Sequence, residues 1–127
     1  MYLDTDIILA LIKKEDWLKK YVKISSLKPA KTSALTIIEA RIVLEREYGK
    51  KESITALSKI NHFKIQIIPL GEKTLEKSNE LMEKYPKLGI FDSIHAACSM
   101  LANETLLSTD SVFLTINELR IKDPRSF

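Results

Sequence analysis

Two kinds of apolar pattern alternate along the chain. Short runs of apolar and β-branched residues are typical of buried strands, whereas longer segments repeat an apolar residue every three or four positions, as helices packed on one side do. The short runs predict strands at residues 1–4, 30–34, 63–70, 105–108 and 119–123. The periodic segments predict helices at residues 6–14, 15–27, 36–49, 53–61, 73–85 and 91–104, with a helical turn at 111–116.

Residues at the ends of some elements support these boundaries. Thr5 is a candidate N-cap of the first helix, and Gly49 suits the C-terminal end of the helix over residues 36–49. That helix and the next one, over residues 53–61, are expected to pair as an α-helical hairpin.

Strands that alternate with helices predict an α/β fold, in which a parallel sheet has helices on both faces. The chain of 127 residues contains no repeat, linker or low-complexity stretch, so we expect a single domain over residues 1–127. In such folds ligands bind beyond the carboxyl ends of the strands. Functional residues are therefore expected at that edge of the sheet.

Composition narrows the class of protein. A hydrophobic content of 45% is enough for a real core, and a net charge of +3 permits a nucleic acid partner without requiring one. Cys98, the single cysteine, lies on an apolar helix face and is interpreted as a core residue. The first residues do not resemble a signal peptide, and no apolar run approaches the roughly 20 residues that cross a bilayer. We expect a soluble, cytoplasmic protein without a membrane partner.

Four acids stand at the ends of predicted elements. Asp4 ends the first strand, and Asp110 follows the strand over residues 105–108 by two positions. Glu39 and Asp92 each lie in the first turn of a predicted helix. Carboxylates that meet at one edge repel one another and raise one another's pKa unless a cation binds, and Mg²⁺ or Mn²⁺ suits such oxygen ligands.

Each acid also has a purely structural explanation. Asp92 could cap its helix, and Glu39 stands three residues after Thr36, as in a capping box. Asp110 could initiate a turn, whereas Asp4 ends an apolar strand and needs a partner in any case. The spacing alone leaves both explanations open.

His95 lies one helical turn after Asp92. This spacing would allow both side chains to face one metal ion, although histidines in such positions are more often structural. The chain has no glycine-rich phosphate loop, no nucleophilic serine motif and no Cys–His metal spacing.

Four segments of the chain, in order, resemble the PIN-domain ribonucleases, and most closely the small VapC-type toxins of toxin–antitoxin modules. The order and separation of these segments match over essentially the whole chain. They are YLDTDIILA, TSALTIIEARIVL, GIFDSIHAA and LLSTDSVF.

The resemblance implies a PIN-like three-layer sandwich with a five-stranded parallel sheet flanked by helices. It also implies endoribonuclease activity that hydrolyses RNA phosphodiesters with Mg²⁺ or Mn²⁺, a cognate antitoxin protein, and a homodimer. The family's catalytic and metal-binding acids correspond to Asp4, Glu39, Asp92 and Asp110. Asp4 and Asp92 would be the principal metal ligands, and the other two would complete the ligand set or orient the attacking water.

Three further positions bear on the resemblance. Thr109 matches the hydroxyl residue that commonly precedes the last acid, and Phe113 matches an aromatic residue that follows it. Asp6 stands where the family often has asparagine, and the extra acid could raise metal affinity or change the geometry of the site. Asp6 and Thr109 are therefore expected to support the metal ligands from behind.

Basic residues near this edge are candidates for holding the RNA backbone. They would contact phosphates and position the RNA without reading its sequence. The candidates are Lys13, Lys14, Arg41, Lys84 and Lys87.

Two other functions stay open. The acids could all be structural, in a non-catalytic module that binds RNA or protein. Alternatively, Asp4-Thr5-Asp6 forms a D-x-D motif after a strand, as in phosphatases and phosphotransferases of the haloacid-dehalogenase kind, although Ile8 does not fit that motif. A receiver-type phosphoacceptor would need adjacent acids, which this motif lacks, and a lysine such as Lys122.

Overall fold

A parallel five-stranded sheet organises the molecule. The structure is a computed structural model that describes residues 1–126, and in this range the strand order is β3-β2-β1-β4-β5 with every pair parallel. The central strand is therefore the first one in the chain. The strands are β1 (Tyr2–Leu3), β2 (Lys31–Ser33), β3 (Gln66–Ile68), β4 (Leu106–Leu107) and β5 (Ile121–Lys122).

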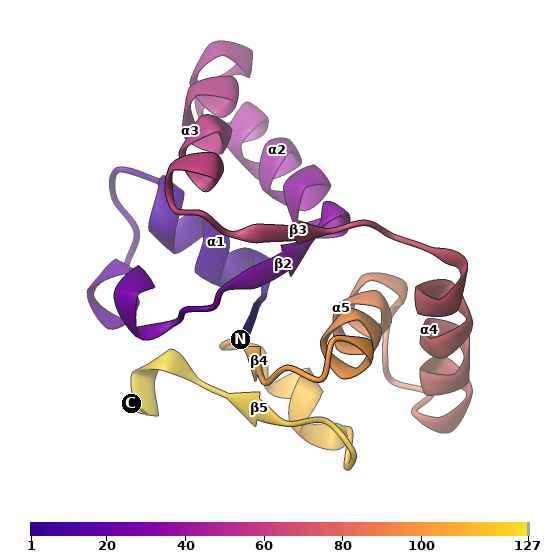
Figure 1. Ribbon diagram of the computed structural model, residues 1–127. Coiled ribbons are helices and arrows are strands. Elements are labelled where there is room, and N and C mark those ends of the chain that lie inside the picture. Colours follow the sequence, from indigo (N-terminus) through magenta and orange to yellow (C-terminus); the bar gives the residue numbers. More distant parts are fainter. Residues whose placement is uncertain (127) are drawn as a thin grey trace.

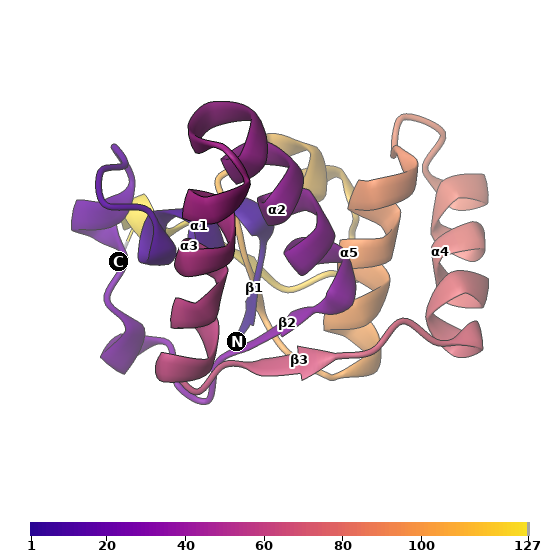
Figure 2. The same cartoon turned by 90° about the horizontal axis from the view of Figure 1, so that it is seen from above.

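The helices cover both faces of this sheet. As Figures 1 and 2 show, α1, α2 and α3 gather on one side, and α4 and α5 pack together on the other. The expected three-layer α/β architecture is confirmed. The helices are α1 (Thr5–Ile12), α2 (Ala34–Tyr48), α3 (Lys50–His62), α4 (Glu72–Lys84) and α5 (Ile90–Leu101).

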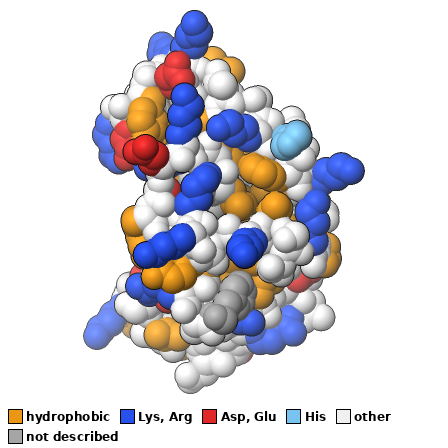
Figure 3. Space-filling model, turned by 90° about the vertical axis from the view of Figure 1, so that its left-hand side faces the viewer, with side chains coloured by type: hydrophobic (Ala, Val, Ile, Leu, Met, Phe, Trp, Pro, Cys, Tyr) orange, Lys and Arg blue, Asp and Glu red, His pale blue; other side chains and the backbone are white. Residues whose placement is uncertain are grey.

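Basic side chains are prominent on one side of the molecule. Figure 3 shows the side that carries the loop after α1 and the C-terminal end, where lysine and arginine greatly outnumber acids in view. Lys20, Lys23 and Arg125 are among the exposed basic residues of the chain.

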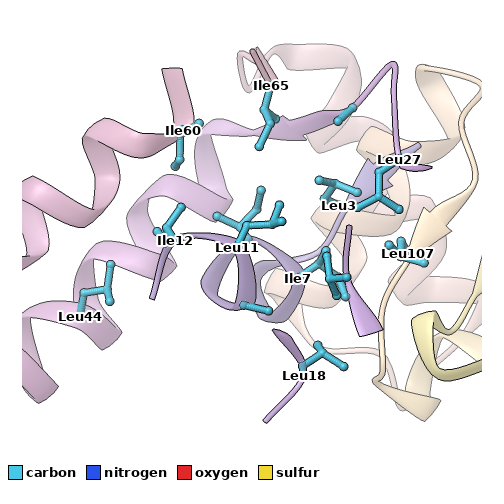
Figure 4. Packing of buried hydrophobic residues seen from close by; sticks show 14 residues of the cluster. Leu3, Ile7, Leu11, Ile12, Leu18, Leu27, Leu44, Ile60, Ile65 and Leu107 are labelled. Carbon is cyan, nitrogen blue, oxygen red and sulfur yellow. The ribbon is translucent and has the colours of Figure 1, made fainter. Parts of the chain in front are cut away.

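Each central strand contributes to two separate cores, because successive side chains of a strand point to opposite faces. Leu3 and Leu107 pack with α1 and its neighbours, as Figure 4 shows. Tyr2 and Leu106 point the other way, into the core beneath α4 and α5. Cys98 is buried in this second core, as expected.

The segment over residues 15–27 does not form the predicted α-helix. It contains two short 3₁₀ turns, η1 (Lys19–Tyr21) and η2 (Ile24–Ser26). Its buried residues, Leu18, Val22 and Leu27, are not confined to helical spacing, and all three join the first core. The segment crosses the end of α1, where the Lys19 ammonium donates hydrogen bonds to the carbonyl oxygens of Ala10 and Lys13 at 3.1 and 2.8 Å.

The other predicted elements are confirmed with small shifts in their boundaries, and Gly49 ends α2 as expected. The predicted helical turn is the 3₁₀ helix η3 (Ser111–Thr115), and the described chain ends in η4 (Pro124–Ser126). None of the helices within residues 1–126 is long and apolar enough to cross a bilayer.

Phe113 in η3 is fully buried beside Leu106 and Ile116. Phe113→Ala should lower the free energy of unfolding by about 3–5 kcal/mol, because it removes buried apolar surface and leaves a cavity. Urea denaturation followed by circular dichroism measures this loss. Its neighbour Leu114 is 69% exposed, so Leu114→Ala is the matched control and should change stability by less than about 0.5 kcal/mol.

Candidate active site

Asp4 is held firmly at the carboxyl end of β1. Its backbone is extended and it caps α1, with its Oδ1 accepting a hydrogen bond from the Thr5 amide at 2.8 Å. The cap is thus Asp4 and not Thr5, contrary to the sequence prediction. Its Oδ2 accepts a hydrogen bond from the Ser108 hydroxyl at 2.6 Å, just beyond β4. Asp4 therefore has the partners that a buried strand-end acid requires.

Asp110 follows β4 in the same loop. It caps η3 by accepting a hydrogen bond from the Val112 amide at 3.0 Å, so the expected turn-initiating role is confirmed. The Asp110 amide in turn donates to the Ser108 hydroxyl at 3.0 Å. Asp110 is exposed, and its capping bond uses only Oδ1. Its Oδ2 accepts no hydrogen bond from another residue within 1–126.

Glu39 lies in the second turn of α2, because the helix begins at Ala34 after Ser33. Thr36 is consequently inside the helix, and the proposed capping box with Glu39 is wrong. The Oε1 of Glu39 instead accepts hydrogen bonds from the Thr5 hydroxyl at 2.9 Å and from His95 Nε2 at 2.5 Å. Burial opposes ionisation of Glu39, but these bonds and the charge of His95 lower its pKa overall.

His95 is buried, and both of its ring nitrogens are engaged. Nδ1 lies 2.8 Å from the Tyr2 hydroxyl, which itself donates to the Ser33 hydroxyl at 2.7 Å. Nε2 faces the Glu39 carboxylate, which can only accept, and Nδ1 shares its hydrogen bond with the Tyr2 hydroxyl. Burial disfavours the charged form of the ring, but Glu39 and Asp4 raise the pKa of His95. His95 thus positions Glu39, and its ring has no nitrogen left for a metal.

Asp92 lies in the first turn of α5 but does not cap it. Gly89 is the N-cap, and no side chain caps this helix, so the cap explanation for Asp92 is wrong. Within residues 1–126 its carboxylate accepts no hydrogen bond. Partial burial raises the pKa of Asp92, and the charges of Asp110, Asp4 and Glu39 raise it further, against the opposite effect of His95. Asp92 therefore repels three other carboxylates and lacks a compensating partner.

The four predicted acids meet because of the topology. Helices that connect parallel strands run opposite to them, so the starts of α2 and α5 lie at the edge where β1 and β4 end. Their carboxylate oxygens are the donors that Mg²⁺ and Mn²⁺ prefer. In the placed side chains of residues 1–126, however, no three Asp, Glu, His or Cys groups are close enough together to enclose an ion. The donor chemistry fits a hard divalent ion, and the free oxygens of Asp92 are the best available.

Asp6 contacts the loop after β4, in which Thr109 lies. Its Oδ2 accepts hydrogen bonds from the backbone amide and the hydroxyl of Thr109, at 3.0 and 2.5 Å. Burial raises the pKa of Asp6, and the Asp4 charge adds to this effect. Asp6 and Thr109 therefore hold the loop that carries Asp110, behind the four acids.

The basic candidates are scattered over the surface. Lys13 ends α1, about 12 Å of helix from Asp4, and it pairs with Glu47 at 3.1 Å. Lys84 pairs with Glu118 at 3.2 Å. Lys14, Arg41 and Lys87 are exposed. Their role in RNA binding stays a prediction.

Several residues that support the site were not singled out from the sequence. Tyr2, Ser33 and Ser108 carry the hydroxyl groups that hold His95 and Asp4. The available signal was a hydroxyl residue at the end of each of the two strands that flank β1. This signal points to the site only when the strand order, which brings these strand ends close to β1, is known.

A family model described as "PIN domain" matches residues 1–119. The chain belongs to the PIN-domain family. No curated protein sequence shows significant similarity to this PIN domain.

Solved structures with the same fold include toxin–antitoxin complexes and a toxin from several bacteria. VapBC2 from Rickettsia felis, bound to a DNA fragment from its promoter, is 20% identical with a TM-score of 0.77, and the match covers 96% of each chain. VapC20 from Mycobacterium tuberculosis, described as a sarcin–ricin loop cleaving toxin, is 16% identical with a TM-score of 0.77 and covers 91% of this chain and 94% of that one. DNA-bound VapBC from Salmonella typhimurium is 15% identical with a TM-score of 0.78, and the match covers 97% of this chain and 96% of that one. At these identities the likeness establishes the fold.

The raised pKa of Asp92 predicts how its replacement affects stability. The folded protein holds the Asp92 proton more tightly than the unfolded chain, so ionisation of Asp92 destabilises the fold progressively as pH rises. The stability of Asp92→Asn relative to wild type should therefore increase from about pH 4 to about pH 7. The gain should be on the order of 0.5 kcal/mol, because solvent screens this half-exposed carboxylate. Urea denaturation in EDTA at both pH values measures it.

Glu76→Gln on the exposed face of α4 is the matched control and should show no such trend. A relative stability of Asp92→Asn that is independent of pH would mean that Asp92 does not lie in a cluster of repelling carboxylates.

Proposed function

We propose that this PIN domain is a metal-dependent endoribonuclease. The observation that carries the proposal is the unpartnered Asp92 carboxylate among three other acids at the carboxyl edge of the sheet. Such a group is costly unless a cation compensates it. Its position in a PIN domain, together with the RNA-cleaving description of the structurally similar VapC20, favours RNA hydrolysis.

Asp4 and Asp92 would hold Mg²⁺ or Mn²⁺, directly or through water, with Asp110 beside them. When bound, such an ion makes water more acidic and offsets the negative charge that develops on the phosphate during hydrolysis. Ser108 and the Thr5 amide hold the Asp4 carboxylate in one orientation, so this side chain would lose little conformational freedom when it binds the ion.

Glu39 is suited to orienting the attacking water. His95 and Thr5 fix its Oε1, which leaves Oε2 to accept a hydrogen bond from a water molecule. The hydrogen bond and charge interaction with His95 lower the pKa of Glu39 against the effect of burial, which favours the ionised, acceptor-only form of its carboxylate. Asp6 and Thr109 would fix the loop that presents Asp110.

The alternatives have less support. In the D-x-D motif, Asp6 is bound to Thr109 and lies behind Asp4, where it could not assist a nucleophilic Asp4 in phosphate transfer. A non-catalytic binding module would need all the acids to be structural, and Asp92 has no structural partner within residues 1–126. A metal-binding measurement separates the module from the nuclease.

Cleavage of RNA by the purified protein tests the proposal. Incubation with single-stranded and structured RNA should give fragments in Mg²⁺ or Mn²⁺ and none in excess EDTA. Asp92→Asn should lower the rate by at least about a hundredfold, a loss of about 2.7 kcal/mol of transition-state stabilisation, while Glu76→Gln should cleave at the wild-type rate. Equal cleavage in EDTA, or full activity of Asp92→Asn, would contradict this mechanism.

Metal binding gives a second readout that does not depend on the choice of RNA. Millimolar Mn²⁺ should raise the melting temperature of the wild type, because a ligand that binds only the folded state stabilises it. The shift should be much smaller in Asp92→Asn. An unchanged wild-type melting temperature would favour the non-catalytic module.

We also propose that the protein is the toxin of a toxin–antitoxin pair. Solved structures with this fold include a toxin–antitoxin complex from Klebsiella pneumoniae and VapBC complexes, although their low identity supports only the fold. An antitoxin segment could lie over the acidic edge and place an arginine against the carboxylates, because a bidentate pair would compensate their charge. Co-expression with a small protein encoded next to this gene, followed by purification of one complex, tests the partner.

A homodimer is the expected state of the isolated protein. Ile38 and Ile42, one turn apart on α2, are 53% and 57% exposed, and Ile54 on α3 is 60% exposed. Exposed apolar side chains of this size commonly mark a protein interface when they are grouped. Light scattering at micromolar concentration should give about twice the chain mass of 14.5 kDa, and a purely monomeric result would contradict the dimer.

A further inference from the structure

Two hollows connect the acidic edge with the basic face of the molecule. The first, of about 360 Å³, begins at Thr109 and Asp110 and ends at Arg125. The second, also about 360 Å³, begins at Arg125 and ends beside Lys20, Tyr21 and Lys23. Arg125 lines both hollows, so they adjoin at this side chain, and together they are called the path below.

The far end of this path combines exposed aromatic rings with cations. Trp17 is 62% exposed and Tyr21 is 38% exposed. The Arg125 guanidinium lies 5.8 Å from the centre of the Trp17 ring, and the Lys20 ammonium lies 5.1 Å from the centre of the Tyr21 ring. Both rings lie in the segment between α1 and β2 that does not form the predicted helix.

Most of the positive charge here is available to a ligand. Within residues 1–126, Lys20 and Lys23 form no ion pair with an acid, and both are exposed. Arg125 is paired with Asp123, so it contributes less net charge, although its edge still borders both hollows. Figure 3 shows the side that carries the loop after α1 and the C-terminal end, where basic side chains are prominent.

A single strand of nucleic acid has the chemistry that fits this path. Its unpaired bases stack on aromatic rings, and its phosphates bind lysine and arginine, whereas the bases of a duplex already stack on one another. An acidic peptide would match the charges but would leave the two exposed rings unused. The path also includes Asp110, one of the four acids to which the cleavage of RNA has been assigned above.

We propose that Trp17, Lys20, Tyr21, Lys23 and Arg125 form the surface that binds a single-stranded segment of the RNA substrate and leads it to the acidic site. This inference rests on the proposed ribonuclease function for the identity of the ligand. It places RNA binding beside η1 and η4, and not at the scattered basic candidates of the sequence analysis.

Trp17 provides a direct readout, because it is the only tryptophan in the chain. The full-length protein, in EDTA and low salt, is titrated with a single-stranded RNA of about ten nucleotides, a length within the range of known single-strand sites. Stacking of a base on Trp17 should quench its fluorescence, and an RNA duplex of the same length should quench it much less. A poly-aspartate peptide should leave the fluorescence unchanged.

Substitutions then separate stacking from charge. Fluorescence anisotropy of labelled RNA should show that Trp17→Ala weakens binding about tenfold, as the loss of one stacked base would, while Trp17→Phe retains most of the affinity. Lys20→Ala with Lys23→Ala should reduce the slope of log affinity against log salt by about 1.4, because each phosphate contact on a single strand contributes about 0.7. The matched control is Lys50→Ala with Lys51→Ala at the exposed start of α3, which should leave the slope nearly unchanged.

Several results would overturn the inference. RNA binding without a change in Trp17 fluorescence would place the RNA elsewhere, as would an equal loss of affinity in the control double variant. Equal quenching by poly-aspartate would instead indicate a surface for acidic protein segments. The ribonuclease proposal can fail separately, since quenching by single-stranded RNA without any cleavage would support this surface and contradict only the catalytic role.

Discussion

The Asp4 carboxylate joins three parts of the fold at one point. One oxygen caps α1 through the Thr5 amide, and the other accepts the Ser108 hydroxyl just beyond β4. The Asp4 amide also donates to the Leu107 carbonyl, as part of the contact between the two central strands. The position of one buried carboxylate therefore sets the direction of α1 and the shape of the loop that carries Asp110. The other functional side chains are arranged around this point.

Negative charge at this edge is compensated unevenly. Hydroxyl and amide donors stabilise Asp4, the buried His95 ring stabilises Glu39, and a capping amide binds Asp110. Asp92 receives none of these within residues 1–126 and feels the charges of the other acids. An arrangement that compensates each acid except one leaves a carboxylate that a cation would stabilise, which is the physical basis for the metal dependence that we propose.

Short strands require support from outside the sheet. β1 and β4 contain two residues each, so few backbone hydrogen bonds join these strands where the acids lie. Packing in the two cores and a set of side-chain hydrogen bonds also hold this part of the sheet in place. Tyr2 shows both contributions, because its ring is buried under α5 while its hydroxyl holds His95, and through it Glu39. Packing and the geometry of the site are therefore coupled through one residue.

Local sequence was sufficient for most of the fold. Alternating strand and helix patterns identify a parallel sheet with helices on both faces, and nearly every element lies where its periodicity predicts. The segment over residues 15–27 is the exception, because its apolar residues match a helix locally while their burial is decided by contacts with the end of α1. Local periodicity cannot report a contact with a distant element.

The acids show where local information ends. The order of motifs was enough to predict that Asp4, Glu39, Asp92 and Asp110 lie at one edge, because topology brings the starts of helices and the ends of parallel strands together there. Sequence could not decide whether Asp92 and Glu39 were caps, since capping depends on the residue at which a helix begins, and boundaries shift by a few residues. The pairing of His95 with Glu39 joins residues 56 positions apart. Only the tertiary structure decided such contacts, because hydrogen bonds and charge interactions depend on distances in space that no local pattern encodes.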